Sequence, residues 1–120
     1  MTCLPNLGEK APDFKSNSTM GPIKLSDYCG KWIVLFSHPG DFTPVCTTEF
    51  LAFASLASEF KKRNTQLLGL SVDSNASHLA WIYNILQLTG VNIPFPIIED
   101  RDMKIANLYG MISAPMSNTS

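Results

Sequence analysis

The sequence predicts an α/β fold, in which helices pack against a largely parallel sheet. Three short runs rich in β-branched and aromatic residues are each followed by a segment with helical spacing of its apolar residues. This alternation of strand and helix requires right-handed crossovers between parallel strands. The chain has 120 residues, 45% of them hydrophobic, and shows no internal repeat. We therefore expect a single domain over residues 1–120, with one core.

The N-terminal part is expected to contribute a hairpin and then a strand. Residues 14–16 and 23–25 flank Met20-Gly21-Pro22, a turn signal that predicts a short hairpin. The run from Trp32 to Phe36 shows no alternation of apolar and polar residues. Such a run is typical of a strand buried on both faces, so we expect it at the centre of the sheet.

A helix is predicted to follow this strand after a short loop. Thr43 is a suitable N-cap, and Pro44 suits the first helical position because its missing N–H has no partner there. Apolar residues recur at helical spacing as far as Phe60. The cations of residues 61–63 then match the negative end of a helix. The pattern predicts one continuous helix over this stretch.

A second strand and a second helix come next. Residues 67–72 form an apolar run that predicts a buried strand, and residues 76–88 have helical spacing. Gly90 is expected to end this helix. Its apolar residues predict one buried face, made of Leu79, Ile82, Tyr83 and Leu86.

The last predicted elements are a short strand and a short helix. Residues 95–98 predict the strand, and the prolines on either side of Phe95 restrict it to an edge or strand-start position. Asp100 is the expected cap of a helix that ends near Tyr109, with Gly110 closing it.

Charge and cysteine content exclude several classes of function. The net charge is −1, from nine basic and ten acidic residues, so the sequence predicts no nucleic-acid partner and no membrane partner. The longest apolar run is far shorter than the roughly 20 residues of a membrane helix. The N-terminus lacks the pattern of a signal peptide, so we expect a cytoplasmic protein. Three cysteines are an odd and sparse set, unlike a secreted disulfide scaffold.

Cys46 is the candidate reactive residue. Counting from Thr43 as N-cap, it occupies the third helical position, among backbone N–H groups that lack helical partners. The positive potential there favours a thiolate, which is the nucleophilic form of cysteine. The alternative is an inert buried cysteine, and the spacing by itself leaves both interpretations open.

The neighbours of Cys46 supply further candidates. The Thr43 hydroxyl is placed to bond either the thiolate or a substrate oxygen, and Pro39 stiffens the loop before it. His38 is interpreted either as orienting this loop or influencing Cys46, or as making a structural hydrogen bond. His78 with Trp81 is interpreted as a capping or packing pair. A zinc site from His38, Cys46 and His78 is not expected, because the chain lacks closely spaced ligand pairs.

The motif Pro39-x-x-x-Thr43-x-x-Cys46 resembles the active-site signature of the peroxiredoxins. The longer string over residues 36–49 is similar to the one-cysteine, peroxiredoxin-six type. Further similarity to that type is found in residues 70–74, 78–81, 95–98 and 108–111. The resemblance implies a thioredoxin-like, three-layer α/β/α fold. It also implies an enzyme that reduces hydrogen peroxide and organic hydroperoxides through a cysteine sulfenic acid.

The resemblance also implies roles for single residues. Cys46 would attack the peroxide, Thr43 would bind it, and Pro39 would shield the sulfur. Glu49 would help to position an arginine, which in the family stabilises the departing oxygen. Neither arginine of this sequence, Arg63 or Arg101, matches the family position.

In the family that arginine lies further along the chain, with additional strands. The resemblance therefore predicts that residues 1–120 are an AhpC/TSA-type domain lacking its C-terminal strands, with an uncovered sheet edge and weak peroxidase activity. The competing hypothesis is a non-catalytic thioredoxin-like fragment that acts as a binding or assembly module through that edge.

Partners follow from the same resemblance. Cys3 and Cys29 match no resolving position of the family, so an external thiol, such as glutathione or another small thiol, is the expected reductant. A homodimer is expected. No metal and no cofactor are predicted.

Overall fold

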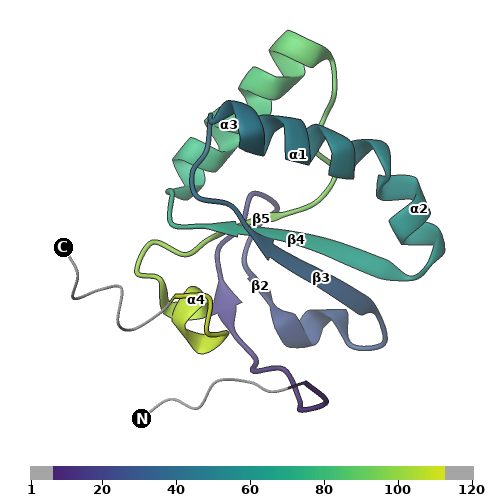
Figure 1. The fold of residues 1–120 in the computed structure, drawn as a ribbon, viewed down its shortest axis with the longest axis vertical. Helices are drawn as coiled ribbons and strands as arrows, with labels where there is room; N and C mark the ends of the chain where they lie inside the picture. Colours follow the sequence, from purple (N-terminus) through teal and green to yellow (C-terminus); the bar gives the residue numbers. More distant parts are fainter. Residues whose placement is uncertain (1–6, 113–120) are drawn as a thin grey trace.

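The computed structural model describes residues 7–112 and has the expected layers (Figure 1). Helices α1 and α3 lie on one side of a parallel sheet, and helix α4 lies with the hairpin on the other side. This arrangement confirms the α/β class and the three-layer, thioredoxin-like architecture. In chain order the elements are β1 (Lys15–Ser16), β2 (Ile23–Lys24), the 3-10 turn η1 (Leu25–Tyr28), β3 (Trp32–Ser37), α1 (Pro44–Ser55), α2 (Ala57–Lys62), β4 (Thr65–Ser71), α3 (Asn75–Thr89), β5 (Ile97–Glu99) and α4 (Lys104–Leu108).

The sheet has the order β3-β4-β5, and all three strands are parallel. Among the strands that the structure describes, β4 is therefore central, and the prediction that the Trp32–Phe36 run forms the central strand was wrong for this part of the chain. Within residues 7–112, β3 pairs only with β4. Its side chains are accordingly half-buried, and Trp32 at its start is 77% exposed. Strand β5 is at the other edge of this sheet, as its prolines predicted.

Strand β4 divides the core into two clusters. Because successive side chains of a strand point to opposite faces, Leu67 packs under α1 and α3 while Leu68 and Leu70 pack against the layer of α4 and the hairpin. The first cluster contains Cys46 and Phe50 of α1, so the candidate sulfur is part of the larger core.

Gly69 allows α1 to approach the centre of β4. A Cβ atom at this position would lie 3.2 Å from Cζ of Phe50. The ring of Phe50, which is 1% exposed, therefore lies in the space that a side chain would fill. A glycine in a strand interior often marks such a close approach.

The predicted continuous first helix is interrupted at Leu56, where α1 ends and α2 begins. The Ser55 hydroxyl donates to the Ala52 carbonyl at 2.8 Å. Back-bonding of this kind competes with the backbone ladder and bends helices. The apolar spacing continued across the bend, which is why the sequence predicted one helix.

Helix α3 has the predicted limits within one residue, and Gly90 ends it with φ of 75°. Its buried face was predicted wrongly. The residues that it buries are His78, Trp81 and Ile85, whereas Leu79, Tyr83 and Leu86 are exposed. The face is set by the Trp81 ring and by hydrogen bonds of His78, a polar residue that a hydrophobicity pattern does not count.

The hairpin β1–β2 is confirmed, with Lys15 opposite Lys24. The segment after it runs along the outer edge of β5, where Thr19 N donates to Ile97 O and Glu99 N donates to Asn17 O. Asp100 caps α4 as predicted, although it lies four residues before the helix begins. Its carboxylate accepts from the N–H groups of Ile105 and Ala106, both at 2.9 Å.

The helices within residues 7–112 include no segment long and apolar enough to cross a membrane.

Candidate active site

Cys46 lies in the first turn of α1, directly behind its cap. The backbone of Thr43 is extended, and its hydroxyl accepts a hydrogen bond from the Cys46 N–H at 3.3 Å. This contact confirms Thr43 as N-cap, Pro44 as the first helical residue and Cys46 as the third. The Cys46 side chain is buried, with 1% of the residue exposed. The sulfur therefore sits at the positive end of a helix with little access to solvent.

The Thr43 hydroxyl is also bound on its other side. It donates to the Gly40 carbonyl at 3.3 Å while it accepts from Cys46 N. These distances are long for hydrogen bonds of their type. A substrate oxygen entering the site would therefore compete only with weak hydrogen bonds. The Thr43 hydroxyl and the Cys46 N–H can bind that oxygen at small energetic cost.

A second threonine and a tryptophan fix the same helical turn. Thr47 Oγ1 donates to the Thr43 carbonyl at 2.9 Å and accepts from Trp81 Nε1 at 3.1 Å. Trp81 is fully buried in α3. This hydrogen bond joins the first turn of α1 to α3, beside the packed rings of Phe50 and Trp81. Sequence reasoning interpreted Trp81 only as a packing or capping residue.

Of the other predicted site residues, His38 is buried, whereas two lie at the surface. Pro39 and Glu49 are both solvent-exposed, with Glu49 one turn after Cys46 on α1. Pro39 and His38 line a cavity of about 170 Å³ at the carboxyl ends of the strands. Cys46 is not among the residues that line this cavity.

The loop before Thr43 contains a strained residue. Phe42 has φ of 66°, in the left-handed region, and its side chain is half exposed. A non-glycine residue in this region costs on the order of 1–3 kcal/mol and persists only where the surroundings hold it. The strained residue lies directly between Asp41 and the helix cap.

Asp41 is the most highly connected residue of this loop. Its carboxylate lies 2.7 Å from His38 Nε2 and 2.7 Å from His78 Nδ1, and it accepts from the Ser77 hydroxyl at 2.9 Å. Its backbone N–H donates to Asp73 at 2.6 Å. Sequence reasoning did not single out Asp41. The sequence signal that could have identified Asp41 was its position three residues after His38 in a short loop, where a carboxylate can reach the imidazole.

The charge of Asp41 is stabilised by these contacts. Burial by itself raises the pKa of the Asp41 carboxyl, but hydrogen bonds from His38, His78 and Ser77, with the charge of His78, outweigh it. Together they hold the pKa of Asp41 below its ordinary value of 3.8. His38 thus makes a structural hydrogen bond, and it does so within the loop that it was expected to orient.

The two histidines meet at Asp41 rather than at the cysteine. Ligating atoms of His38, Asp41 and His78 lie within 4.8 Å of one another, and Cys46 is not part of this group. A tetrahedral zinc ion keeps neighbouring ligand atoms about 3.3 Å apart, given its bond lengths. The contacts of 2.7 Å are hydrogen-bond distances, so this cluster is built around shared protons.

The remaining cysteines and arginines lie elsewhere. Cys29 is a free, exposed thiol at the end of η1, Cys46 is a free, buried thiol, and Cys3 lies outside the described residues. Arg63 is bound to Glu59 at the C-terminal end of α2, at 2.9 Å. Arg101 is exposed, just after β5.

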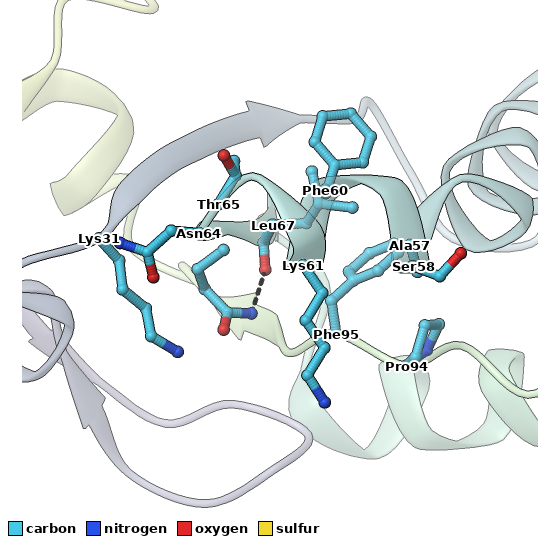
Figure 2. A pocket seen from close by; sticks show the side chains of 11 residues that line it. Lys31, Ala57, Ser58, Phe60, Lys61, Asn64, Thr65, Leu67, Pro94 and Phe95 are labelled. Carbon is cyan, nitrogen blue, oxygen red and sulfur yellow. Dashed lines mark hydrogen bonds between the residues drawn. The ribbon is translucent and has the colours of Figure 1, made fainter.

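Another cavity lies at the opposite end of the strands, where β3 and β4 begin (Figure 2). It has a volume of about 440 Å³, and Lys31, Asn64 and Thr65 line it at the starts of β3 and β4. The loop that precedes α1 follows the carboxyl end of β3. Because the strands are parallel, this cavity at their amino ends is remote from that loop. The cavity contains none of the predicted site residues.

Residues 7–119 match the sequence model of the AhpC/TSA family. The chain is 71% identical over 118 residues to peroxiredoxin 2 of Caldanaerobacter subterraneus subsp. tengcongensis, covering 98% of this chain and 53% of that protein. It is 61% identical over 117 residues to a peroxiredoxin of Aquifex aeolicus, covering 97% and 53%. The chain spans about half the length of the curated relatives it matches.

Solved structures agree in fold. A yeast mitochondrial 1-Cys peroxiredoxin, described with thiol resolution via glutathione/thioredoxin systems, matches with a TM-score of 0.85 and 50% identity, over 92% of this chain and 53% of that one. A cysteine-to-serine mutant of the peroxiredoxin 6 of Arenicola marina matches with a TM-score of 0.83 and 43% identity, over 92% and 51%. The resemblance to the one-cysteine, peroxiredoxin-six type is thereby confirmed.

Proposed function

We propose that this chain, which belongs to the AhpC/TSA family, contains the peroxide-reducing site of a thiol-dependent peroxidase, with Cys46 as the nucleophile. The observation that carries this proposal is the position of Cys46 at the third residue of α1, hydrogen-bonded through its backbone to the Thr43 cap. Helix N-termini favour the thiolate form, and the thiolate is the reactive species. Relatives at 71% and 61% identity that are named peroxiredoxins support the same reaction.

In the proposed reaction the Cys46 thiolate attacks one oxygen of a hydroperoxide. A sulfur–oxygen bond forms as the oxygen–oxygen bond breaks, and the departing oxygen takes a proton and leaves as water or an alcohol. The product at Cys46 is a sulfenic acid, so the sulfur is oxidised by two electrons and the peroxide is reduced by two.

Each neighbour has a proposed part in this step. The Thr43 hydroxyl gives up its weak bond to the Gly40 carbonyl, and the Cys46 N–H gives up its weak bond to that hydroxyl. Both groups then bind the peroxide oxygens, which orients the peroxide. Pro39 stiffens the loop and limits access of water. His38 holds the loop through Asp41, and Glu49 is the proposed partner for a cation that stabilises the departing oxygen.

An external thiol is the proposed reductant. One thiol attacks the sulfenic acid to give a mixed disulfide and water, and a second thiol then releases Cys46 as the thiol, leaving an oxidised disulfide of the reductant. Glutathione or another small thiol suits this role, because the yeast relative with a TM-score of 0.85 is described with glutathione/thioredoxin systems.

We also propose that the protein is cytoplasmic and forms a homodimer. Cys29 and Cys46 are both free thiols, which is the usual state of cysteines in reducing compartments. The apolar side chains of Phe42 and Val45, next to the site, are exposed and offer surface for a second copy. Sedimentation analysis of the protein tests the dimer.

The function is tested by trapping the sulfenic acid. The protein is treated with hydrogen peroxide and a dimedone-type trap, and labelling of each cysteine is followed by mass spectrometry. We expect Cys46 to be labelled first, at least tenfold faster than Cys29, although Cys29 is exposed and Cys46 is buried. Accessibility alone would give the opposite order, so the result reports on chemical reactivity.

Two variants complete this test. Cys29→Ser is the matched control and should keep the rate of peroxide consumption, whereas Cys46→Ser should abolish it. Labelling of Cys46 no faster than of Cys29 or Cys3 would contradict the proposal and favour a non-catalytic binding module.

A further inference from the structure

Asp41 ties the loop before α1 to two other parts of the molecule. Its carboxylate accepts from the Ser77 hydroxyl and contacts His78, both in α3. Its backbone N–H donates to Asp73, in the connection between β4 and α3. Through His38 the same carboxylate also binds the start of its own loop. The loop is therefore fixed at its centre.

The hydrogen-bond partners assign the protons of His78. Its Nε2 lies 3.0 Å from the Ile98 carbonyl, which can only accept, so Nε2 carries a proton. Its Nδ1 lies 2.7 Å from an Asp41 oxygen that also accepts from Ser77. With Asp41 ionised, that oxygen can only accept, so Nδ1 carries a proton as well. His78 is then an imidazolium, fully buried and paired with Asp41.

The protons of His38 follow from the same reasoning. Its Nε2 donates to the other oxygen of Asp41 at 2.7 Å, while its Nδ1 is buried without a hydrogen-bond partner. A second imidazolium here would leave a buried N–H unsatisfied, which is costly. His38 is therefore neutral, with its proton on Nε2. The cluster has one negative and one positive charge.

This cluster lies beside the strained residue of the site. Phe42, with φ of 66°, directly follows Asp41 and directly precedes Thr43. Asp41 holds the backbone on one side of the strain and the Thr43 cap holds it on the other. Release of Asp41 would let Phe42 relax and move the Thr43 hydroxyl away from the Cys46 N–H.

We propose that Asp41 is a positioning residue of the peroxide-reducing site: paired with a doubly protonated His78, its carboxylate fixes the Phe42 turn and thereby sets the Thr43 hydroxyl at Cys46. The kinetic consequence rests on the proposed function, whereas the ion pair does not. The other charged groups at this end of α3 are Asp73, bound to Asp41 N, and Glu99, which accepts from Asn75 N.

The ion pair is tested first in the unmodified protein. The chain has two histidines, so ¹⁵N-histidine labelling gives four ring nitrogen signals that one histidine variant assigns. At pH 7 we expect both nitrogens of His78 to show protonated shifts, and His38 to show one protonated and one unprotonated nitrogen. An unprotonated nitrogen on His78 would overturn the proposal whether or not any variant folds.

The positioning role is tested by the rate of Cys46 oxidation. Asp41→Asn keeps the size of the side chain and removes its charge. We expect its second-order rate with hydrogen peroxide to fall at least tenfold, with native circular dichroism. Asp102→Asn is the matched control, because Asp102 is an exposed acid that accepts only from the nearby Lys104 N–H among the described contacts.

The outcomes separate this inference from the proposed function. A rate for Asp41→Asn within twofold of the unmodified protein overturns the positioning role. If the unmodified protein does not react with peroxide at all, the proposed function fails, and the histidine spectra then decide the Asp41–His78 pair alone.

Discussion

Two ion pairs of similar length flank α1 and differ in their surroundings. Asp41 and His78 approach to 2.7 Å with side chains 1% and 0% exposed, just before the helix. Glu59 and Arg63 approach to 2.9 Å with side chains 50% and 70% exposed, in the α2 region. The lower effective dielectric of the interior strengthens attraction and raises the cost of an unpaired charge. Length alone therefore does not rank these contacts.

The number of partners differs as well. Asp41 gathers three side-chain donors from two segments of the chain, so it fixes one element relative to another. Glu59 and Arg63 belong to one local stretch of helix and make their contact across a single turn. The buried pair can therefore transmit its geometry to the candidate site, while the exposed pair stabilises only its own helix.

Removing one partner of each pair should give the largest contrast. Asp41→Asn leaves the buried charge of His78 without its counter-ion, and we expect the free energy of unfolding to fall by about 3 kcal/mol. Urea unfolding at pH 7, followed by circular dichroism, measures the loss. Glu59→Gln is the matched control because it makes the same chemical change at an exposed site. Equal losses of unfolding free energy in Asp41→Asn and Glu59→Gln would contradict the conclusion that the buried pair matters more than the exposed pair.

Acid should separate the pairs next. Because the pKa of Asp41 is lower in the folded protein than its ordinary value of 3.8, its ionised form stabilises the fold above about pH 4. That contribution decreases as the pH falls below 4 toward the folded pKa. We expect the stability difference between the unmodified protein and Asp41→Asn to be constant from pH 5 to 7 and to shrink below pH 4. Urea midpoints at each pH measure it, and a difference that grows in acid would contradict the sign.

The sequence predicted the chemistry of the helix start because that signal is local. Thr43, Pro44 and Cys46 lie within four residues, and capping rules alone place the sulfur at the third helical position. The resemblance to peroxiredoxins carried the proposed reaction and the three-layer fold. These expectations needed no knowledge of which segments meet in space.

The sequence could not predict what holds that helix start in place. Asp41 and His78 are 37 positions apart, and their contact depends on how α3 packs on the sheet. The apolar pattern predicted the wrong face of α3, because it gave no weight to a buried histidine. It also placed the β3 run at the centre of the sheet. The order of the strands depends on which strands pair, and the apolar pattern does not give that information. Each of these errors concerns a long-range contact.

Added salt should change the free energy of unfolding least, but it should distinguish the exposed ion pair from the buried one most clearly. At low ionic strength we expect Glu59→Gln to lower the free energy of unfolding by about 0.3–0.5 kcal/mol, as measured for exposed helical pairs. In 1 M NaCl the screening length is about 3 Å, so this loss should disappear. The loss from Asp41→Asn should remain, because ions do not enter between side chains that are at most 1% exposed. Paired urea titrations at two salt concentrations measure both. If salt reduced both losses by the same fraction, the Asp41–His78 pair would have to be open to solvent, and it could not hold the strained Phe42 turn in place.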